Sequence, residues 1–220
     1  MNLPKNNFTL FTSIFIFVFV FSFISFSQVV DKDGNSYKTV KIGKQEWMSE
    51  NLKTEHYRNG DEIPQVQDKD EWDKTTTGAW CYYENQTENG TVYGKIYNWY
   101  AVNDPRGLAP EGWHVPADDE WTKLTDFLGG AETAGTKLKS TNGWDEDFAG
   151  NNNSGFSALP GGYRTHDGYF SNKGRNALFW STTEFNSERV WFRNVIGSIP
   201  DVYRPNYDKN FGLYIRCVKD

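Results

Sequence analysis

The most continuous hydrophobic pattern in this chain lies at its start. Residues 14–24 read IFIFVFVFSFI, and Lys5 is the only charged residue before them. The short SFS that follows supplies the small residues that a signal peptidase recognises, so the pattern predicts a secretory signal peptide, residues 1–27, cleaved before Gln28. The apolar stretch Phe8–Phe26 is also long enough to cross a bilayer, and an uncleaved anchor is therefore the alternative.

A helical period appears in PEGWHVPADDEWTKLTDFLGG, residues 110–130. Pro116 ends the strand-like GWHV, and three acids then occupy a first helical turn, where the exposed N–H groups and the dipole favour negative charge. The acids are Asp118, Asp119 and Glu120, and the apolar positions that follow at helical spacing are Trp121, Leu124 and Leu128. We predict a helix over 117–128 that buries this stripe and ends at the following pair of glycines.

Elsewhere the pattern is of short strands and turns. DKDGNSYKTVKIGKQEWMSENL alternates around the turn residues DGN, which predicts a hairpin, and ALFWSTTEF, RVWFRNV and FGLYIRCVKD are strand-like. Residues 54–78 and Thr141–Gly168 have no period and are rich in polar and turn residues. No internal repeat is present, so we expect one mature domain, residues 28–220, of the α+β class. It should be loop-rich, with short antiparallel strands and one or two helices.

Charge excludes some classes of partner. Residues 1–27 contain one lysine and no acid, so the mature chain carries −6 − 1 = −7. Nucleic-acid binding depends on clustered lysine and arginine, and so does a polybasic contact with membrane lipids. We therefore expect no nucleic-acid partner and no membrane insertion once the signal is cleaved. All nine tryptophans and all twelve tyrosines lie in the mature chain, which predicts an aromatic core. The alternative is that some of these rings are exposed as stacking platforms for sugars.

The acids beside His114 are the obvious place to look for chemistry. The favourable interaction of acidic side chains with the first turn of a helix accounts for all three acids. A single histidine in such a segment is more often packed and hydrogen-bonded than a base. His56 and His166 stand at no metal-ligand spacing, and the chain has neither a GxSxG motif nor a phosphate-binding glycine loop. DKDGN resembles a calcium loop but fails the EF-hand spacing. We therefore predict no catalytic residue and a structural role for His114.

The mature chain contains two cysteines, Cys81 and Cys217. An even number of cysteines in a secreted chain usually means a disulfide, which we expect here. The alternative is two free thiols with chemistry of their own.

Several segments together resemble a known family. They are DKDGNSYKTVKIGKQEWMSENL, YGKIYNWYAV, LAPEGWHVPADDEWTKLTDFLGG, AGTKLKS, SGFSALPGGYR, WSTTE and IRCVKD. In this order they resemble the Fibrobacter succinogenes major paralogous domain, within the C-type-lectin-like and formylglycine-generating-enzyme-like superfamily. The likeness covers essentially the whole mature chain. It implies a bacterial domain, secreted or on the cell surface, with a C-type-lectin-like fold and largely unassigned biochemical activity.

Departures from the enzymes of that superfamily matter for function. The copper-dependent members use two cysteines close together near the C-terminus, where this chain has only Cys217, and the iron-dependent members need three histidine ligands that are not in pattern here. The resemblance therefore implies no catalysis. Family members often have two further cysteines, beside Val92 and at Ala109 of this chain, and their joint absence implies that Cys81 pairs with Cys217.

In lectin-like folds the long loops carry recognition residues, and the loop Thr141–Gly168 combines aromatic rings with oxygen ligands. The candidate ligand-binding residues are Trp144, Asp145, Asp147, Asn151, Asn152, Asn153, Tyr163 and Arg164. Such a set suits a glycan bound with or without Ca²⁺, although asparagine and aspartate also stabilise turns and the lectin sugar motifs EPN, QPD and WND are absent. We expect a non-catalytic binding or adhesion module for a glycan or protein ligand. The alternatives are a structural surface protein without a small ligand and, less favoured, an oxidative enzyme.

Overall fold

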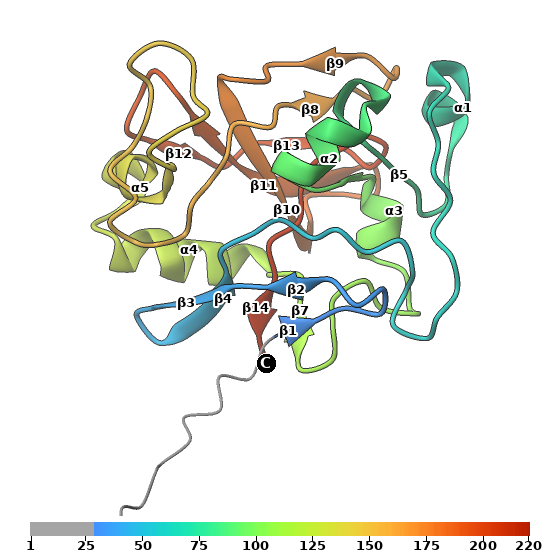
Figure 1. Ribbon diagram of the computed structural model, residues 1–220, viewed down its shortest axis with the longest axis horizontal. Coiled ribbons are helices and arrows are strands. Elements are labelled where there is room, and N and C mark those ends of the chain that lie inside the picture. The colour runs from blue at the N-terminus through green and yellow to red at the C-terminus, as the bar shows by residue number, and fades with distance from the viewer. Residues whose placement is uncertain (1–28) are drawn as a thin grey trace, which may run out of the picture.

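The computed structural model describes residues 29–220, which contain helices and antiparallel sheets (Figure 1). The expected signal peptide lies outside the described residues. The helices are α1 (Lys69–Lys74), α2 (Thr87–Tyr93), α3 (Trp99–Val102), α4 (Asp118–Phe127) and α5 (Ala131–Leu138), with a 3₁₀ turn η1 (Tyr83–Asn85). The strands are β1 (Val29–Val30), β2 (Ser36–Tyr37), β3 (Thr39–Ile42), β4 (Gln45–Met48), β5 (Trp80–Cys81), β6 (Ile96–Tyr97), β7 (Trp113–His114), β8 (Tyr163–Arg164), β9 (Phe170–Ser171), β10 (Asn176–Glu184), β11 (Arg189–Ile196), β12 (Val202–Tyr203), β13 (Asn206–Asp208) and β14 (Val218–Lys219). The α+β class is confirmed. The expected number of one or two helices is wrong, because residues 29–220 contain five α-helices, and three of them have seven residues or fewer, which is too short to show a helical period in the sequence. None of the helices within residues 29–220 is long and apolar enough to span a bilayer.

The expected helix over 117–128 is α4, with Ala117 and Leu128 as its caps. Its predicted stripe is buried: Trp121 is 1%, Leu124 0% and Leu128 6% exposed. The Trp121 ring lies 4.8 Å from that of Trp47 and is stacked on Phe179. Local capping and periodicity therefore specified this helix correctly.

Helix α5 was not predicted, because AETAGTKL is short and contains a glycine. That glycine, Gly135, donates its N–H to the carbonyl oxygen of Pro200 at 2.8 Å. A Cβ atom here would lie 2.5 Å from the same oxygen, so the close approach of α5 to the chain before β12 requires glycine.

Two four-stranded antiparallel sheets organise the chain. In the first, β10 pairs with β11, and β12 and β13 both pair with β11. The second has the order β3-β4-β14-β7, so the C-terminal strand lies between strands from the beginning and the middle of the chain (Figure 1). The hairpin expected around DGN is formed by β1 and β2, and β3 and β4 form another.

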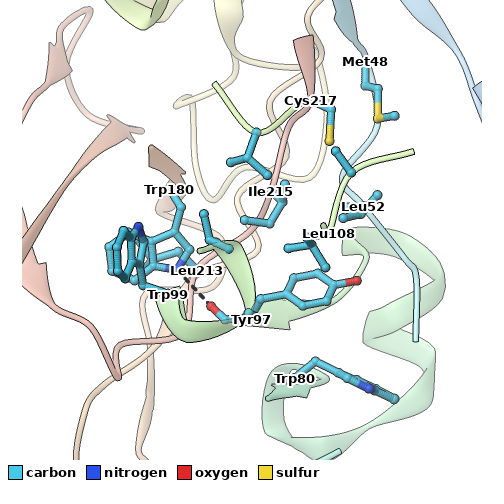
Figure 2. Packing of buried hydrophobic residues seen from close by; sticks show 14 of the residues in the cluster. Met48, Leu52, Trp80, Tyr97, Trp99, Leu108, Trp180, Leu213, Ile215 and Cys217 are labelled. Carbon is cyan, nitrogen blue, oxygen red and sulfur yellow. Dashed lines mark hydrogen bonds between the residues drawn. The ribbon is translucent and has the colours of Figure 1, made fainter. Parts of the chain in front are cut away.

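The core consists of two aromatic clusters, and strand β10 and the C-terminal segment run between them. Successive residues alternate: Leu178 and Trp180 belong to the first cluster, and Ala177 and Phe179 to the second. Figure 2 shows part of the first cluster, where the Trp180 indole donates to the carbonyl oxygen of Tyr97 at 2.9 Å. The prediction of an aromatic core is confirmed.

The same alternation overturns the expected disulfide. Cys217 belongs to the first cluster (Figure 2), whereas Cys81 belongs to the second. Both are buried free thiols. Because side chains point alternately to opposite faces of extended chain, the two sulfurs face different clusters. Burial raises the pKa of the Cys81 thiol to about 12 and also raises that of Cys217, so the two side chains are protonated and unreactive at neutral pH.

Candidate binding site

A polar cleft of about 360 Å³ opens where five segments meet: the link between β2 and β3, the chain after β4, the end of α2, the chain after α5 and the loop before β8. Its lining consists mainly of amide, hydroxyl and charged side chains. The lining residues are Lys38, Ser49, Glu50, Asn51, Lys53, Thr91, Val92, Tyr93, Gly94, Ser140, Thr141, Asn142, Asn152, Ser157 and Leu159. We call this site the polar cleft. Its volume is within the range of small-molecule sites in proteins.

One wall of the polar cleft is fixed by Asn51. Its Nδ2 donates to the carbonyl oxygen of Tyr93 at 2.7 Å, which ties the chain after β4 to the end of α2. Gly94 follows with φ +82°, and a Cβ there would lie 3.0 Å from Asn51 Cβ. Only glycine adopts this conformation without strain, so the YG dipeptide is what brings these two segments together.

The opposite wall comes from the loops after α5. The Asn152 side chain accepts from the Ser157 N–H and donates to its hydroxyl, both at 2.9 Å. The Ser140 hydroxyl donates to the carbonyl oxygen of Asn142 at 2.7 Å. These local bonds hold the loops in shape, and the exposed Asn142 side chain lines the cleft.

A buried cation lies directly behind these walls. Arg216 is 1% exposed and donates to the Asn51 side-chain oxygen at 2.6 Å and to the Ser157 carbonyl oxygen at 2.9 Å. Its other acceptors are the carbonyl oxygens of Met48 and Phe156, so none of its four hydrogen-bond partners is a carboxylate. Burial lowers its pKa to about 9, against a weak opposing effect of Glu50 and Cys217, and the guanidinium is therefore still charged at neutral pH.

At the rim, Lys38 and Lys53 both line the polar cleft. Neither lysine forms an ion pair with a carboxylate in the part of the chain that the structure describes. Glu50 is the one acid in the lining, and its carboxylate accepts the backbone N–H of Lys38 at 3.2 Å. The lining therefore combines two cations with one anion.

A second hollow of about 350 Å³ adjoins the polar cleft and shares Lys53 and Thr91 with it. Lys95 in this hollow is paired with Glu55 at 2.9 Å and lies over the Trp80 ring. The half-buried Tyr82 supplies an aromatic wall. The two hollows are adjacent and together are large enough for more than one unit of a chain-like ligand.

Comparison with known proteins places the chain in a family. The model of the Fibrobacter succinogenes major domain matches residues 40–219. The chain belongs to this family. No curated protein and no solved structure gives a significant match.

In this Fibrobacter succinogenes major domain, the loop residues expected to bind a ligand lie in different places. Asn152 lines the polar cleft, whereas Trp144 is 8% exposed and donates its indole N–H to the Ser140 hydroxyl. Asp145 pairs with Arg175 at 3.4 Å. Asp147, Asn151 and Asn153 are exposed but do not line the cleft. The structure therefore brings one of these six residues to the site.

The other two predicted ligand residues, Tyr163 and Arg164, also lie outside the polar cleft. Arg164 is 0% exposed; it donates to the carbonyl oxygens of Val66 and Gln67 and lies over the Trp72 ring. Its role in the domain is structural, because its donors and its flat face are already occupied. Tyr163 is half-buried and its ring stacks on Phe211.

Sequence reasoning missed most of the cleft, including Asn51, Lys53, Tyr93 and Asn142. The family resemblance contained a signal for it. Four of the segments that resemble the family supply residues of the polar cleft: the segment that ends in ENL and the segments that contain YG, LKS and SGFS. A fifth segment, IRCVKD, supplies Arg216. Their convergence in space is visible only in the folded domain.

The segment around His114 links two parts of the fold that are distant in the sequence. The His114 ring bonds Asp220 at 2.7 Å and Glu120 at 3.0 Å, joining the C-terminus to the start of α4. Burial lowers the pKa of His114, but the hydrogen bonds and charges of Asp220 and Glu120 outweigh burial and raise it. The helix-start account of Asp118 is incomplete, because its carboxylate pairs with Arg193 at 2.5 Å and with Arg204 at 2.8 Å.

The acids of DKDGN are also committed to the fold. Asp31 accepts from the backbone N–H groups of Asp33 and Asn35 and from the Tyr37 hydroxyl. Asp33 accepts from Thr54 and pairs with the His56 ring. Within residues 29–220, no three His, Cys, Asp or Glu side chains come together in a way that could hold a metal ion.

Proposed function

We propose that this domain is a non-catalytic carbohydrate-binding module of C-type-lectin-like architecture that works outside the cell. The observation that carries the proposal is the polar cleft, lined by asparagine, serine and threonine side chains from four segments. Sugars present many hydroxyl groups, and a few positioned amides and hydroxyls on a preformed concave surface are what orients such a ligand.

The architecture supports the same proposal. Short strands and two compact aromatic clusters hold the loops, and the C-terminal strand pairs with β4 and β7. A rigid scaffold with loops at the binding face is the usual arrangement of recognition modules. The extracellular location rests on the signal peptide expected at residues 1–27.

The non-catalytic part of the proposal rests on the chemistry of the lining. Its ionisable side chains are two lysines, one glutamate and a half-buried tyrosine, with no histidine or cysteine among the lining residues. No pair of these groups forms the hydrogen-bonded acid–base arrangement that proton transfer requires.

A matched pair of asparagine variants tests the proposal. Asn142 and Asn153 are both exposed loop residues, but only Asn142 lines the polar cleft. On a glycan array followed by calorimetry, we expect the mature domain to bind at least one saccharide. Asn142→Ala should weaken that binding roughly three- to tenfold, the equivalent of one lost hydrogen bond, and Asn153→Ala should change it less than about twofold.

Two results count against the proposal. The first is a folded domain that binds no saccharide at millimolar concentration. The second is saccharide binding that Asn153→Ala weakens and Asn142→Ala leaves unchanged, which would place the ligand on the exposed loop residues around Asn153, outside the polar cleft.

A further inference from the structure

The charge of the polar cleft is opposite to that of the molecule around it. Residues 29–220 lack only one of the chain's lysines and none of its acids, so they carry −6 − 1 = −7. The cleft nevertheless has Lys38 and Lys53 at its rim against the single carboxylate of Glu50. Both lysine ammonium groups are free of ion pairs within the described residues, so their charge is available to a ligand.

The buried guanidinium adds to this field. Arg216 is bonded to Asn51 and Ser157, which line the cleft, so its charge lies one side chain behind the surface. None of the oxygens to which it donates carries a formal charge. The charge of Glu50 acts on Arg216 and offsets part of this field. Charges in the protein interior are poorly screened, so the buried guanidinium still favours an anion in the cleft.

Lys53 connects the polar cleft with the adjoining hollow. Lys53 lines both the polar cleft and the adjoining hollow, and its backbone is fixed by the Tyr37 hydroxyl at 2.9 Å and by the Lys95 ammonium group. A lysine whose backbone is held at the junction of two hollows can place its ammonium group beside a charge that lies between two units of a linear ligand. Tyr93 in one hollow and Tyr82 in the other offer half-buried rings.

We infer that the ligand of the polar cleft is an acidic saccharide, whose carboxylate binds between Lys38 and Lys53 in front of Arg216. This inference rests on the proposed function and names the class of saccharide. The carboxylate oxygens accept from the two ammonium groups, and the sugar hydroxyls bond the asparagine and serine side chains of the walls. The adjoining hollow takes the next unit of the chain.

The test compares uronic-acid trisaccharides with their methyl esters, which differ in charge but hardly in shape. The panel contains galacturonate, glucuronate and mannuronate oligomers, measured by calorimetry on the mature domain at 50 and 500 mM salt. We expect at least one acid to bind about tenfold more tightly than its ester, and the difference to shrink at high salt.

Lysine variants locate the charge. Lys38→Gln and Lys53→Gln should each weaken binding of the acid about three- to tenfold while leaving the ester nearly unchanged. Lys41→Gln is the matched control, because Lys41 is an exposed lysine on β3 that does not line the cleft. Thermal midpoints close to that of the parent domain will show that each variant is folded.

The outcomes distinguish a failure of this inference from a failure of the proposed function on which it rests. If the acid and the ester bind with equal affinity and Asn142→Ala weakens the binding of both, the inference is wrong, but the proposal of saccharide binding in the polar cleft stands. An acid preference that survives both lysine changes in the cleft also overturns it. Inorganic sulfate that binds as tightly as the trisaccharide contradicts a saccharide ligand, and no binding to any member of the panel or of the glycan array removes both proposals.

Discussion

Replacing Asp118 with asparagine removes the counter-charge of a buried guanidinium. The Asp118 carboxylate pairs with Arg193 at 2.5 Å, and the two side chains are 14% and 3% exposed. Arg193 also donates to the Asp118 carbonyl oxygen and to the Thr122 hydroxyl, so it cannot turn to water when its partner is lost. Asp118→Asn therefore leaves a positive charge in place without an anion.

The size of the effect follows from burial. Two unit charges about 4 Å apart interact by about 4 kcal/mol at an effective dielectric constant of 20, and breaking a buried pair typically costs about 3–5 kcal/mol. Asparagine keeps one acceptor oxygen, and the second partner, Arg204, is 44% exposed and adds little. We expect Asp118→Asn to lower the free energy of unfolding by about 3 kcal/mol, or roughly 6–12 °C in Tm for a chain of this size.

Asp119→Asn is the matched control. Asp119 occupies the same first turn of α4, but it is exposed and pairs only with the exposed Lys123. Helix-dipole and i,i+4 effects amount to about 0.3–1 kcal/mol. Urea denaturation of the two variants should therefore differ by about 2 kcal/mol or more. Equal losses would refute the reasoning and restore the view that Asp118 acts only as a helix-start acid.

The pH dependence provides an independent check. Burial raises the pKa of Asp118, but hydrogen bonds and charges from Arg204 and Arg193 outweigh it, so the folded pKa is lowered. A lowered folded pKa gives stability that is present above the unfolded value, about 3.9, and is lost as pH falls through the folded value. The gap between the parent domain and Asp118→Asn should hold from pH 7 to about pH 4 and close below that. A gap that closes near neutral pH contradicts this assignment.

Three further predictions concern the core, the C-terminus and the thiols. Trp121→Ala should cost about 3–5 kcal/mol, as large-to-small core changes do, and a near-zero change in the urea midpoint would show that the α4 stripe is not core. The stabilising contribution of His114, whose folded pKa is raised, should be fully present below pH about 6.5 and be lost as pH rises through the folded value. Denaturation of the parent domain and His114→Gln at pH 5.5 and 8.5 measures this, and a difference that grows with pH would contradict it. Cys81 and Cys217 should resist thiol reagents in the native domain and give two labelled thiols per chain in denaturant without reductant; a Tm that falls on adding reductant would reinstate the disulfide.

Sequence reasoning succeeded where the relevant interactions are local. The boundaries of α4 follow from the acids of its first turn and the glycines after it, and its buried face follows from the spacing of Trp121, Leu124 and Leu128. Strands β10 and β11 were anticipated from runs of apolar and aromatic residues. Family membership was recognised from segments whose order along the chain is itself a sequence property.

Sequence reasoning failed where two distant segments had to be placed relative to each other. The expected Cys81–Cys217 bond assumed that both sulfurs face one space, but the side on which each one points depends on strand register. Arg164 looked like a ligand-binding residue in a polar loop, yet its donors are taken by carbonyl groups 97 and 98 residues away.

The polar cleft shows most clearly which properties follow from the sequence alone and which depend on the tertiary structure. The sequence by itself determined the aromatic core, the α4 helix and the glycine at position 94, where the chain after α2 passes close to Asn51. Propensity, period and backbone freedom act over a few residues. Only the tertiary structure decided which polar groups share a surface, since Arg216 reaches Asn51 across 165 residues of chain. A side chain's chemistry is fixed by its type, but the charge that a ligand meets is a sum over neighbours, and neighbours are assigned by packing.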